Sequence, residues 1–453
     1  MKPVVIAGGV AAGMSAASIL KRSLPEQQVT VFGREEHISY GACGMPYFIG
    51  GEIESYEDLT VLTPEKAREK RGIDLHVRHE VTAIDRDRHT VTVKHVDSGN
   101  TFEQEYEKLV IATGARAVVP PIPGAELPGV LPLKELEDSI NLDGFLAERK
   151  PTRAVIIGGG YIGVEAAEAF RSRGLEVTVV EALPRILNIV DADLAELAHA
   201  ELEAHDVVVK TGRQVVSITG DKQVEGVELD DGEKLGADVV LLSVGVRPNT
   251  EAAETAGIEL GEKRAVMVDR YLKTNDPDIY AAGDCAVAYH KVLGRPVHVP
   301  LALPANRQGR MAGENIAAEL KGEKLNTFPG VLGSAMIKIF EGEVAKTGVG
   351  ETEIEQYGLR ELESVSIKSH TLAGYYPGAK PMWVKLYYHA HSKRLLGGQI
   401  YGAGRSVLRI NILATAISAG MRLEDVYNLD LGYAPPFSPV WDPILIAARK
   451  GMK

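Results

Sequence analysis

The chain contains the same local pattern twice: an apolar run, a glycine-rich turn and an alanine-rich stretch. The first copy covers residues 4–20 and contains GGVAAG, and the second covers residues 154–170 and contains GGGYIG. A second apolar run follows each copy, at residues 28–32 and 176–181. A strand, a turn, a helix and a second strand make a βαβ crossover, which places the two strands parallel. The repeat therefore predicts an α/β fold with two dinucleotide-binding units.

The second turn has the full spacing of a Rossmann-like pyrophosphate loop. Gly158, Gly160 and Gly163 form a G-x-G-x-x-G pattern between an apolar strand and a helix. The first glycine permits the tight turn, the second lets the pyrophosphate approach the backbone, and the third permits close packing of the helix on the strand. Tyr161 and Ile162 lie within the same turn, and the N-terminus of the helix that follows favours negative charge. We expect these five residues to bind a dinucleotide.

An acidic residue, Glu181, ends the second strand of this unit. A carboxylate at this point accepts hydrogen bonds from the adenosine ribose, whereas an arginine would suit a 2′-phosphate. The pattern favours NADH as the cofactor, and NADPH is the alternative.

The first turn departs from this spacing. Gly8 and Gly13 are present, but Val10 occupies the position of the middle glycine and Gly33 the position of the strand-end acid. A larger ligand held by several segments tolerates Val10 if its pyrophosphate is shifted. The ribose is then served by a water molecule or by a nearby carboxyl group, either Glu35 or Glu36.

The overall composition excludes several classes of protein. With 453 residues, of which 45% are hydrophobic, the chain can form a large core and several domains. A net charge of -12 argues against a nucleic-acid-binding surface. No apolar stretch approaches the roughly 18 residues of a membrane span. The opening residues predict a strand and turn rather than a cleavable leader, so we expect a cytoplasmic protein.

Proline and glycine mark one boundary, and a change of pattern marks another. Residues 118–129, VVPPIPGAELPG, cannot form regular structure and predict an inter-domain connection, and a second boundary is expected near residues 246–249. After about residue 321 the pattern changes to strands at residues 382–389 and 395–401, followed by a helix over residues 406–419. These segments predict a third, α+β domain.

Two further motifs carry a resemblance to a known family. YEKLVIATGA at residues 106–115 and TNDPDIYAAGDCA at residues 274–286 resemble motifs of the flavoprotein disulfide reductases that have two dinucleotide-binding domains. The resemblance implies an FAD domain of residues 1–117 and 246–322, an NADH domain of residues 118–245, and a C-terminal dimerisation domain of residues 323–453. A homodimer is implied. The FAD contacts implied are Gly8, Val10, Ala11, Gly13, Arg34, Val81, Thr113, Gly114 and Asp284.

Cys43 lies in the segment HISYGACGMPYFIGG and is one of only two cysteines. A lone cysteine excludes an internal active-site disulfide of the C-x-x-x-x-C type. Pro46 is tolerated only in the first turn of a helix, so a helix should begin close to Cys43 and favour its thiolate. For Cys285 we expect a small buried hydrophobic side chain.

The segment SYGACGMPY resembles the single-cysteine branch of this family, which contains coenzyme A-disulfide reductases, NADH oxidases and NADH peroxidases. The peroxidases and many of the oxidases carry a histidine at the position of Ala11, so its absence favours exchange with another sulfur. By resemblance, Tyr375 and Tyr433 reach the active site of the partner subunit. Positions that touch the substrate, by the same resemblance, are Ser15, Arg22, Ser39 and Arg71.

These features predict an oxidoreductase that passes electrons from NADH through FAD and Cys43 to coenzyme A disulfide, coenzyme A persulfide or polysulfide. In the oxidised enzyme Cys43 would hold coenzyme A as a mixed disulfide. One alternative is an NADH oxidase or peroxidase in which Cys43 cycles through a sulfenic acid. Another is a flavin reductase that passes electrons to a protein partner. No metal site is expected.

Overall fold

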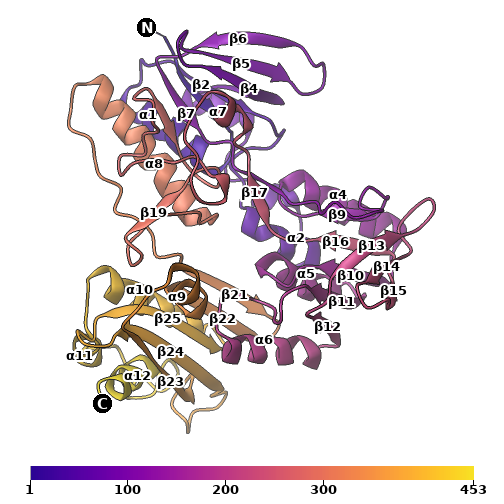
Figure 1. Cartoon of the computed structure of the whole chain (residues 1–453), viewed down its shortest axis with the longest axis vertical. Coiled ribbons are helices and arrows are strands. Elements are labelled where there is room, and N and C mark those ends of the chain that lie inside the picture. The colour runs from indigo at the N-terminus through magenta and orange to yellow at the C-terminus, as the bar shows by residue number, and fades with distance from the viewer. Residues whose placement is uncertain (1) are drawn as a thin grey trace. The chain divides into compact units, whose positions relative to one another are not determined.

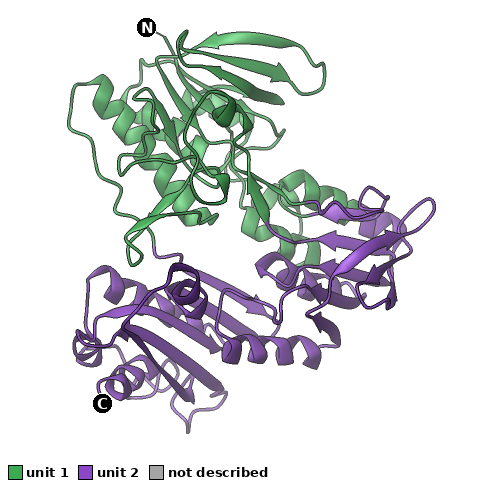
Figure 2. Ribbon diagram, in the orientation of Figure 1, with its two compact units in different colours: residues 1–118, 133–144, 246–331 green, residues 119–132, 145–245, 332–453 purple. Residues whose placement is uncertain are grey.

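The computed structural model describes residues 2–453, which divide into two compact units (Figure 2). Unit 1 contains residues 1–118, 133–144 and 246–331, and unit 2 contains residues 119–132, 145–245 and 332–453. Each unit is therefore built from segments that are distant in the sequence. The linker at residues 118–129 contains no helix or strand, as its prolines and glycines predict.

Unit 1 is built on a five-stranded parallel sheet (Figure 1). Its strand order is β18 (Ile279–Ala281), β7 (Lys108–Ile111), β1 (Val4–Ala7), β2 (Val29–Gly33) and β3 (Asp74–Val77). The central strand β1 is fully buried, because both faces of a parallel sheet are covered. Helix α1 (Ala11–Ser23) packs on α8 (Ala302–Leu320), and a Cβ atom at Gly309 would lie 2.1 Å from the carbonyl oxygen of Ala12. Glycine is thus required where these two helices cross.

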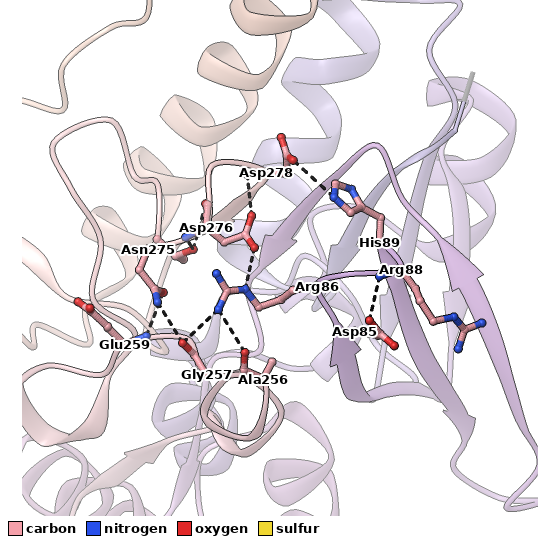
Figure 3. Close-up of polar contacts among 11 residues, drawn as sticks. Asp85, Arg86, Arg88, His89, Ala256, Gly257, Glu259, Asn275, Asp276 and Asp278 are labelled. Atoms are coloured by element: carbon pink, nitrogen blue, oxygen red, sulfur yellow. Dashed lines mark hydrogen bonds and ion pairs between the residues drawn. The ribbon is translucent and has the colours of Figure 1, made fainter.

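An antiparallel sheet in unit 1 is joined to the segment that returns after residue 246. This sheet contains β4 (His79–Asp85), β5 (Thr90–His95) and β6 (Thr101–Glu105). Arg86 follows β4, pairs with Asp276 at 2.7 Å, and donates to the carbonyl oxygens of Ala256 and Gly257 (Figure 3). One side chain therefore holds together parts of the unit that lie about 170–190 residues apart.

Unit 1 also contains several short elements. They are η1 (Ala42–Gly44), α2 (Met45–Gly50), η2 (Tyr56–Leu59), α3 (Pro64–Arg71), β8 (Ala115–Ala117), β17 (Val246–Pro248), α7 (Glu251–Thr255), η3 (Glu262–Arg264), β19 (Ala288–His290) and β20 (Arg295–Val297). Helix α4 (Leu136–Arg149) begins within unit 1.

Unit 2 contains the second parallel sheet, which confirms the predicted internal repeat. Its order is β12 (Val207–Thr211), β11 (Glu176–Glu181), β10 (Arg153–Ile157), β16 (Val239–Leu242) and β9 (Val130–Pro132). Helix α5 (Tyr161–Ser172) connects β10 to β11, and α6 (Ala192–Ala204) follows β11. A three-stranded sheet adds β13 (Val215–Thr219), β14 (Gly226–Leu229) and β15 (Lys234–Gly236).

The C-terminal part of unit 2 is an antiparallel sheet with helices, as the predicted α+β pattern requires. Its strand order is β21 (Ala335–Ile339), β22 (Gly342–Gly348), β25 (Leu395–Gly402), β24 (Pro381–His389) and β23 (Leu362–His370). The helices are α9 (Glu351–Tyr357), η4 (Ser406–Arg409), α10 (Ile410–Ser418), α11 (Leu423–Tyr427) and α12 (Pro443–Gly451). Among the helices of residues 2–453, none has the length and apolar character needed to cross a membrane.

Candidate active site

The second glycine turn lies between β10 and α5. Gly158 has a φ of +107°, and a Cβ atom there would lie 2.5 Å from the carbonyl oxygen of Ser243. A Cβ atom at Gly163 would lie 2.0 Å from the carbonyl oxygen of Gly158. At Gly160, in contrast, a Cβ atom would meet nothing within 4 Å. The outer two glycines therefore fix the turn, and Gly160 leaves open space in which a ligand can approach the backbone.

Glu181 at the end of β11 holds this turn in place. Its Oε2 accepts a hydrogen bond from the N–H of Gly159 at 2.7 Å, and its Oε1 accepts one from the N–H of Leu183 at 2.7 Å. Each carboxylate oxygen has a second lone pair, so Glu181 keeps acceptor capacity for ribose hydroxyls. A 2′-phosphate would bring negative charge to the same carboxylate. The geometry is therefore consistent with the predicted preference for NADH.

The first glycine turn, between β1 and α1, repeats these contacts in unit 1. Gly8 has a φ of +125°, and a Cβ atom there would lie 1.9 Å from the carbonyl oxygen of Ala112. A Cβ atom at Gly13 would lie 1.9 Å from the carbonyl oxygen of Gly8. Val10 is the N-cap of α1, and Ala11 is its first residue. The turn and the N-terminus of this 13-residue helix fit the pyrophosphate of FAD.

Three glutamates gather where the first turn lacks a strand-end acid. Glu35, Glu135 and Glu137 each offer a carboxylate oxygen, and these oxygens lie within 4.8 Å of one another. Arg34 pairs with Glu135 at 3.2 Å, and the N–H of Glu36 donates to Glu137 at 3.0 Å. The sequence indicated Glu35 and Glu36 but not Glu135 and Glu137. The latter two lie about 100 residues further along the chain.

This crowding changes the protonation of Glu35. Burial and the neighbouring carboxylate of Glu135 raise the pKa of Glu35 to about 8, although a hydrogen bond from Tyr40 opposes the shift. The Tyr40 hydroxyl donates to Glu35 at 2.5 Å. Because the folded-state pKa lies above the ordinary value of 4.5, Glu35 favours the folded state at low pH. The contribution of Glu35 to the free energy of unfolding is complete below about pH 4.5 and is lost as the pH rises through about 8.

We expect Glu35→Gln to stabilise the protein at high pH. The free energy of unfolding should rise by about 1–2 kcal/mol at pH 8.5 and change little at pH 4.5, because glutamine stays neutral throughout. Thermal unfolding at both pH values measures the difference, and Glu26→Gln, at an exposed position, is the control. An equal gain at both pH values would contradict the expectation.

Thr113 and Gly114 lie in the turn after β7. The Thr113 hydroxyl donates to the carbonyl oxygen of Asn249 at 2.6 Å, and the Asn249 amide donates to the carbonyl oxygen of Thr113 at 3.0 Å. Gly114 has a φ of +65°, and a Cβ atom there would meet nothing within 4 Å. The segment that returns to unit 1 at residue 246 therefore holds this turn in place.

Asp284 follows β18 and meets a residue that the sequence analysis did not single out. Lys134 Nζ lies 2.9 Å from Asp284 Oδ2, and the carbonyl oxygen of Asp284 accepts a hydrogen bond from His298 at 2.8 Å. Lys134 is half-buried, and burial opposes its charge. Asp284, and more weakly Glu35 and Cys43, nevertheless hold the pKa of Lys134 above its usual value. Lys134 therefore stays a cation, and Cys43 is one of the groups whose charge acts on it.

Cys43 is exposed, and Cys285 is buried. Cys43 lies in η1, and α2 begins two residues later with Pro46 in its first turn, which confirms the predicted position of this helix. The Cys285 thiol donates to the carbonyl oxygens of Ile111 and Ala282 at 3.4 Å, and burial raises its pKa. Cys285 is the small buried side chain that the sequence predicted, and the redox role of Cys43 stays a prediction.

We expect Lys134→Gln to slow the reaction of Cys43 with iodoacetamide at pH 7 by roughly three- to tenfold, because a nearby cation favours the thiolate. The measurement is the alkylation rate of Cys43, followed by mass spectrometry of its peptide. Lys66→Gln removes an exposed charge from α3 and serves as the control. Equal rates for Lys134→Gln and the unchanged protein would exclude this role of Lys134.

The structure brings two of the four predicted substrate residues together, and all four lie in unit 1. Arg22 and Arg71 are exposed and meet at Ser18 of α1: Arg22 donates to its carbonyl oxygen at 3.2 Å and Arg71 to its hydroxyl at 2.7 Å. Ser15 donates to Asn306 of α8 at 2.9 Å. Ser39 has a φ of +48° and donates its N–H to the carbonyl oxygen of Gly9 at 3.2 Å. The two arginines thus form an exposed pair of cations suited to phosphate groups.

Tyr375 and Tyr433 lie in unit 2, and the structure brings them together. Their hydroxyl oxygens are 3.1 Å apart, although 58 residues separate them in the sequence. Their exposed fractions are 76% and 44%. Such exposure is unusual for tyrosine side chains, which normally lie in a core or an interface. That they act on a partner subunit stays a prediction.

The other predicted contacts have less distinctive surroundings. Val81 is buried in β4, and Tyr161 and Ile162 are half-buried at the start of α5. Burial and the carboxylates of Glu353 and Glu165 raise the pKa of Tyr161 above its usual value, so its hydroxyl stays protonated.

Comparison with known proteins agrees with this arrangement. An NAD(P)H sulfur oxidoreductase (CoA-dependent) of Pyrococcus abyssi is 40% identical over 449 residues, which cover 99% of this chain and 98% of the relative. An NADH oxidase of Methanocaldococcus jannaschii is 35% identical over 457 residues, which cover 100% of this chain and 99% of the relative. The solved structure of an NAD-dependent persulfide reductase from A. fulgidus matches with a TM-score of 0.94 and 38% identity, covering 100% of this chain and 83% of that one.

Two family models cover most of the chain. Residues 2–309 match the pyridine nucleotide-disulphide oxidoreductase model, and residues 334–443 match the dimerisation domain of the same family. Enzymes of this family depend on FAD and NAD(P)H, which confirms the predicted cofactors. The chain belongs to the pyridine nucleotide-disulphide oxidoreductase family.

Proposed function

We propose that this enzyme reduces the sulfur–sulfur bond of coenzyme A persulfide or coenzyme A disulfide through Cys43. The observation that carries the proposal is the position of Cys43: an exposed thiol two residues before a short helix, with a charge that acts on the half-buried cation Lys134. The Pyrococcus relative is named for a coenzyme A-dependent sulfur reaction and the A. fulgidus structure for persulfide reduction, which supports this class of substrate.

The residues of this chain have distinct parts in the proposed reaction. When bound, FAD would supply two-electron transfer between NAD(P)H and sulfur. The first glycine turn, Asp284 and the turn at Thr113 would hold FAD, and the second glycine turn would hold the nicotinamide nucleotide. The exposed cations Arg22 and Arg71 bind phosphate groups of coenzyme A.

Sulfur exchange at Cys43 follows ordinary thiol chemistry. The Cys43 thiolate attacks one sulfur of the substrate, the substrate S–S bond breaks, and a mixed disulfide with coenzyme A forms. The departing sulfur takes a proton, which the hydroxyl pair of Tyr375 and Tyr433 can donate. Two electrons from NAD(P)H then break the mixed disulfide, which releases coenzyme A and restores the thiolate of Cys43.

The dimerisation domain indicates a homodimer. We propose that Tyr375 and Tyr433 complete the site of the partner subunit, and that the protein acts in the cytoplasm. The proposed domain limits remain those of the sequence: residues 1–117 and 246–322 for FAD, 118–245 for NAD(P)H and 323–453 for dimerisation.

Oxygen reduction is the second candidate function, because the Methanocaldococcus relative is named an NADH oxidase. It would require Cys43 to cycle between thiolate and sulfenic acid. Ala11, the first residue of α1, supplies no acid or base for proton transfer to a peroxide. Thiol exchange has no such requirement, so the site favours it.

Mass spectrometry of the intact protein tests the proposal. We expect the purified, oxidised protein to carry one coenzyme A adduct, which NADH removes. The adduct should persist in Cys285→Ser and be absent from Cys43→Ser. Oxygen atoms on Cys43 in place of the adduct would favour the oxidase, and an unmodified Cys43 with rapid electron transfer to an added protein acceptor would favour a flavin reductase for a protein partner.

A further inference from the structure

Residues 183–191, in the connection between β11 and α6, contact the second glycine turn. Within it, the N–H of Leu187 donates to the carbonyl oxygen of Gly159 at 2.8 Å. A Cβ atom at Gly159 would lie 2.6 Å from a methyl carbon of Ile186, so the connection packs directly on this peptide. Ile186 and Leu187 are fully buried. Both backbone polar groups of Gly159 are therefore hydrogen-bonded: its N–H donates to Glu181, and its carbonyl oxygen accepts from Leu187.

The conformation of this connection needs external support. Leu187 has a φ of +47°, in the left-handed region that a leucine adopts only when its surroundings hold it there. The residues around Leu187 form no helix or strand, and one turn hydrogen bond, from the N–H of Val190 to the carbonyl oxygen of Leu187 at 2.9 Å, is made within the connection.

The support comes from the C-terminal sheet through Asp191. This carboxylate is 1% exposed and lies 2.6 Å from Lys385 Nζ of β24. It also accepts hydrogen bonds from the Tyr387 hydroxyl and, at 2.7 Å, from the Gln399 amide of β25. The amide oxygen of Gln399 accepts the N–H of Asp191 at 2.9 Å, so two neighbouring strands hold both the backbone and the side chain of Asp191.

Two further contacts support the same link. The Thr352 hydroxyl of α9 donates to the carbonyl oxygen of Asn188 at 2.8 Å, and the N–H of Glu351 donates to Asp191 at 3.1 Å. Burial opposes ionisation of Asp191, but the hydrogen bonds from Lys385, Tyr387 and Gln399 outweigh it, and its pKa lies below the usual value. The aspartate is thus charged and fully satisfied when it is held in this way.

We infer that Asp191 is a positioning residue for NAD(P)H: by fixing residues 183–191 to the C-terminal sheet, it holds the Gly158–Gly163 turn in the shape that receives the dinucleotide. The inference rests on the proposed assignment of that turn to NAD(P)H. Its consequence is that nucleotide affinity depends on strands that belong to the dimerisation domain. Loss of Asp191 frees Leu187 from its left-handed conformation and releases the carbonyl oxygen of Gly159.

Titration of the oxidised, FAD-loaded enzyme with NAD⁺ by calorimetry tests the inference. We expect Asp191→Asn to raise the dissociation constant of NAD⁺ by roughly tenfold and Tyr387→Phe, which removes one hydrogen bond, by roughly threefold. FAD content should stay unchanged. Hydrogen exchange should become faster at the N–H of Leu187.

Asp442→Asn is the matched control. Asp191 is the N-cap residue of α6, and Asp442 is likewise a buried N-cap residue, of α12. Asp442 accepts hydrogen bonds from Arg409 at 2.7 Å and Ser438 at 2.9 Å, and neither partner belongs to the 183–191 connection. Asp442→Asn should lower thermal stability and leave the NAD⁺ dissociation constant unchanged. Equal weakening by both aspartate variants, or NAD⁺ binding by Asp191→Asn and Tyr387→Phe within twofold of the unchanged enzyme, overturns the inference.

Gly160→Ala separates this inference from the assignment on which it rests. A methyl group at Gly160 enters the open space beside the turn, so it should weaken NAD⁺ binding wherever this turn is the nucleotide site. If Gly160→Ala weakens binding and Asp191→Asn does not, only the positioning role fails. If neither variant changes binding, the assignment of the turn fails as well.

Discussion

Cys43→Ser is expected to lower NADH-dependent reduction of coenzyme A disulfide by roughly 10³-fold or more, because a serine hydroxyl neither ionises near neutral pH nor forms a mixed disulfide. Reduction of the bound flavin by NADH should stay within about twofold of the unchanged enzyme, since that step precedes sulfur chemistry. Stopped-flow absorbance measures flavin reduction, and steady-state assays with coenzyme A disulfide, coenzyme A persulfide, peroxide and oxygen measure turnover.

Cys285→Ala is the control for this experiment. The Cys285 thiol is buried and donates hydrogen bonds to two carbonyl oxygens, so its removal should reduce stability slightly and leave turnover unchanged. Full turnover of coenzyme A disulfide by Cys43→Ser would show that the flavin reduces the acceptor directly, and the proposed function would be wrong.

Gly163→Val is expected to abolish reduction of the flavin by NADH, with a loss of roughly 10²-fold or more, while FAD remains bound. The side chain cannot fit, because even a Cβ atom would lie 2.0 Å from the carbonyl oxygen of Gly158 and 2.8 Å from the Ser243 hydroxyl. The turn must open to relieve this overlap, which displaces the backbone that faces the pyrophosphate. The measurement is the NADH concentration dependence of flavin reduction, with dithionite reduction of the same sample as proof that the flavin is competent.

Gly144→Ala is the matched control in an ordinary helix position. A Cβ atom at Gly144 in α4 would meet nothing within 4 Å, so alanine should raise helix stability by about 0.5–1 kcal/mol and leave NADH oxidation unchanged. Normal NADH kinetics in Gly163→Val would place the nucleotide elsewhere on the protein.

Much of the fold could be predicted, because the glycine spacing and the apolar runs that determine it lie within short stretches of sequence. The strand, turn and helix around Gly158 and Gly163 follow from glycine spacing and apolar runs, and both parallel sheets were predicted from them. The helix near Cys43 was likewise predicted from Pro46 alone.

The residues that the sequence did not reveal are those whose roles depend on distant partners. Lys134 meets Asp284 across 150 residues, and Asp191 meets Gln399 across 208. Neither residue lies in a motif, and Lys134 follows a linker whose composition gives no sign of function. The cluster of Glu35, Glu135 and Glu137 could not be predicted for the same reason, since only the fold brings the loop after β2 together with the start of α4.

The strand order also determines which of the two parallel sheets can be completed first during synthesis on the ribosome. The sheet from β9 to β16 is contiguous in the chain, so it can close once residue 242 has emerged. The sheet that contains β1 needs β18, which ends at residue 281, and its helix α1 needs α8, which ends at residue 320. Strand β1 and helix α1 are therefore made well before the elements that complete their packing, and we expect chaperones to bind the nascent segment that contains them.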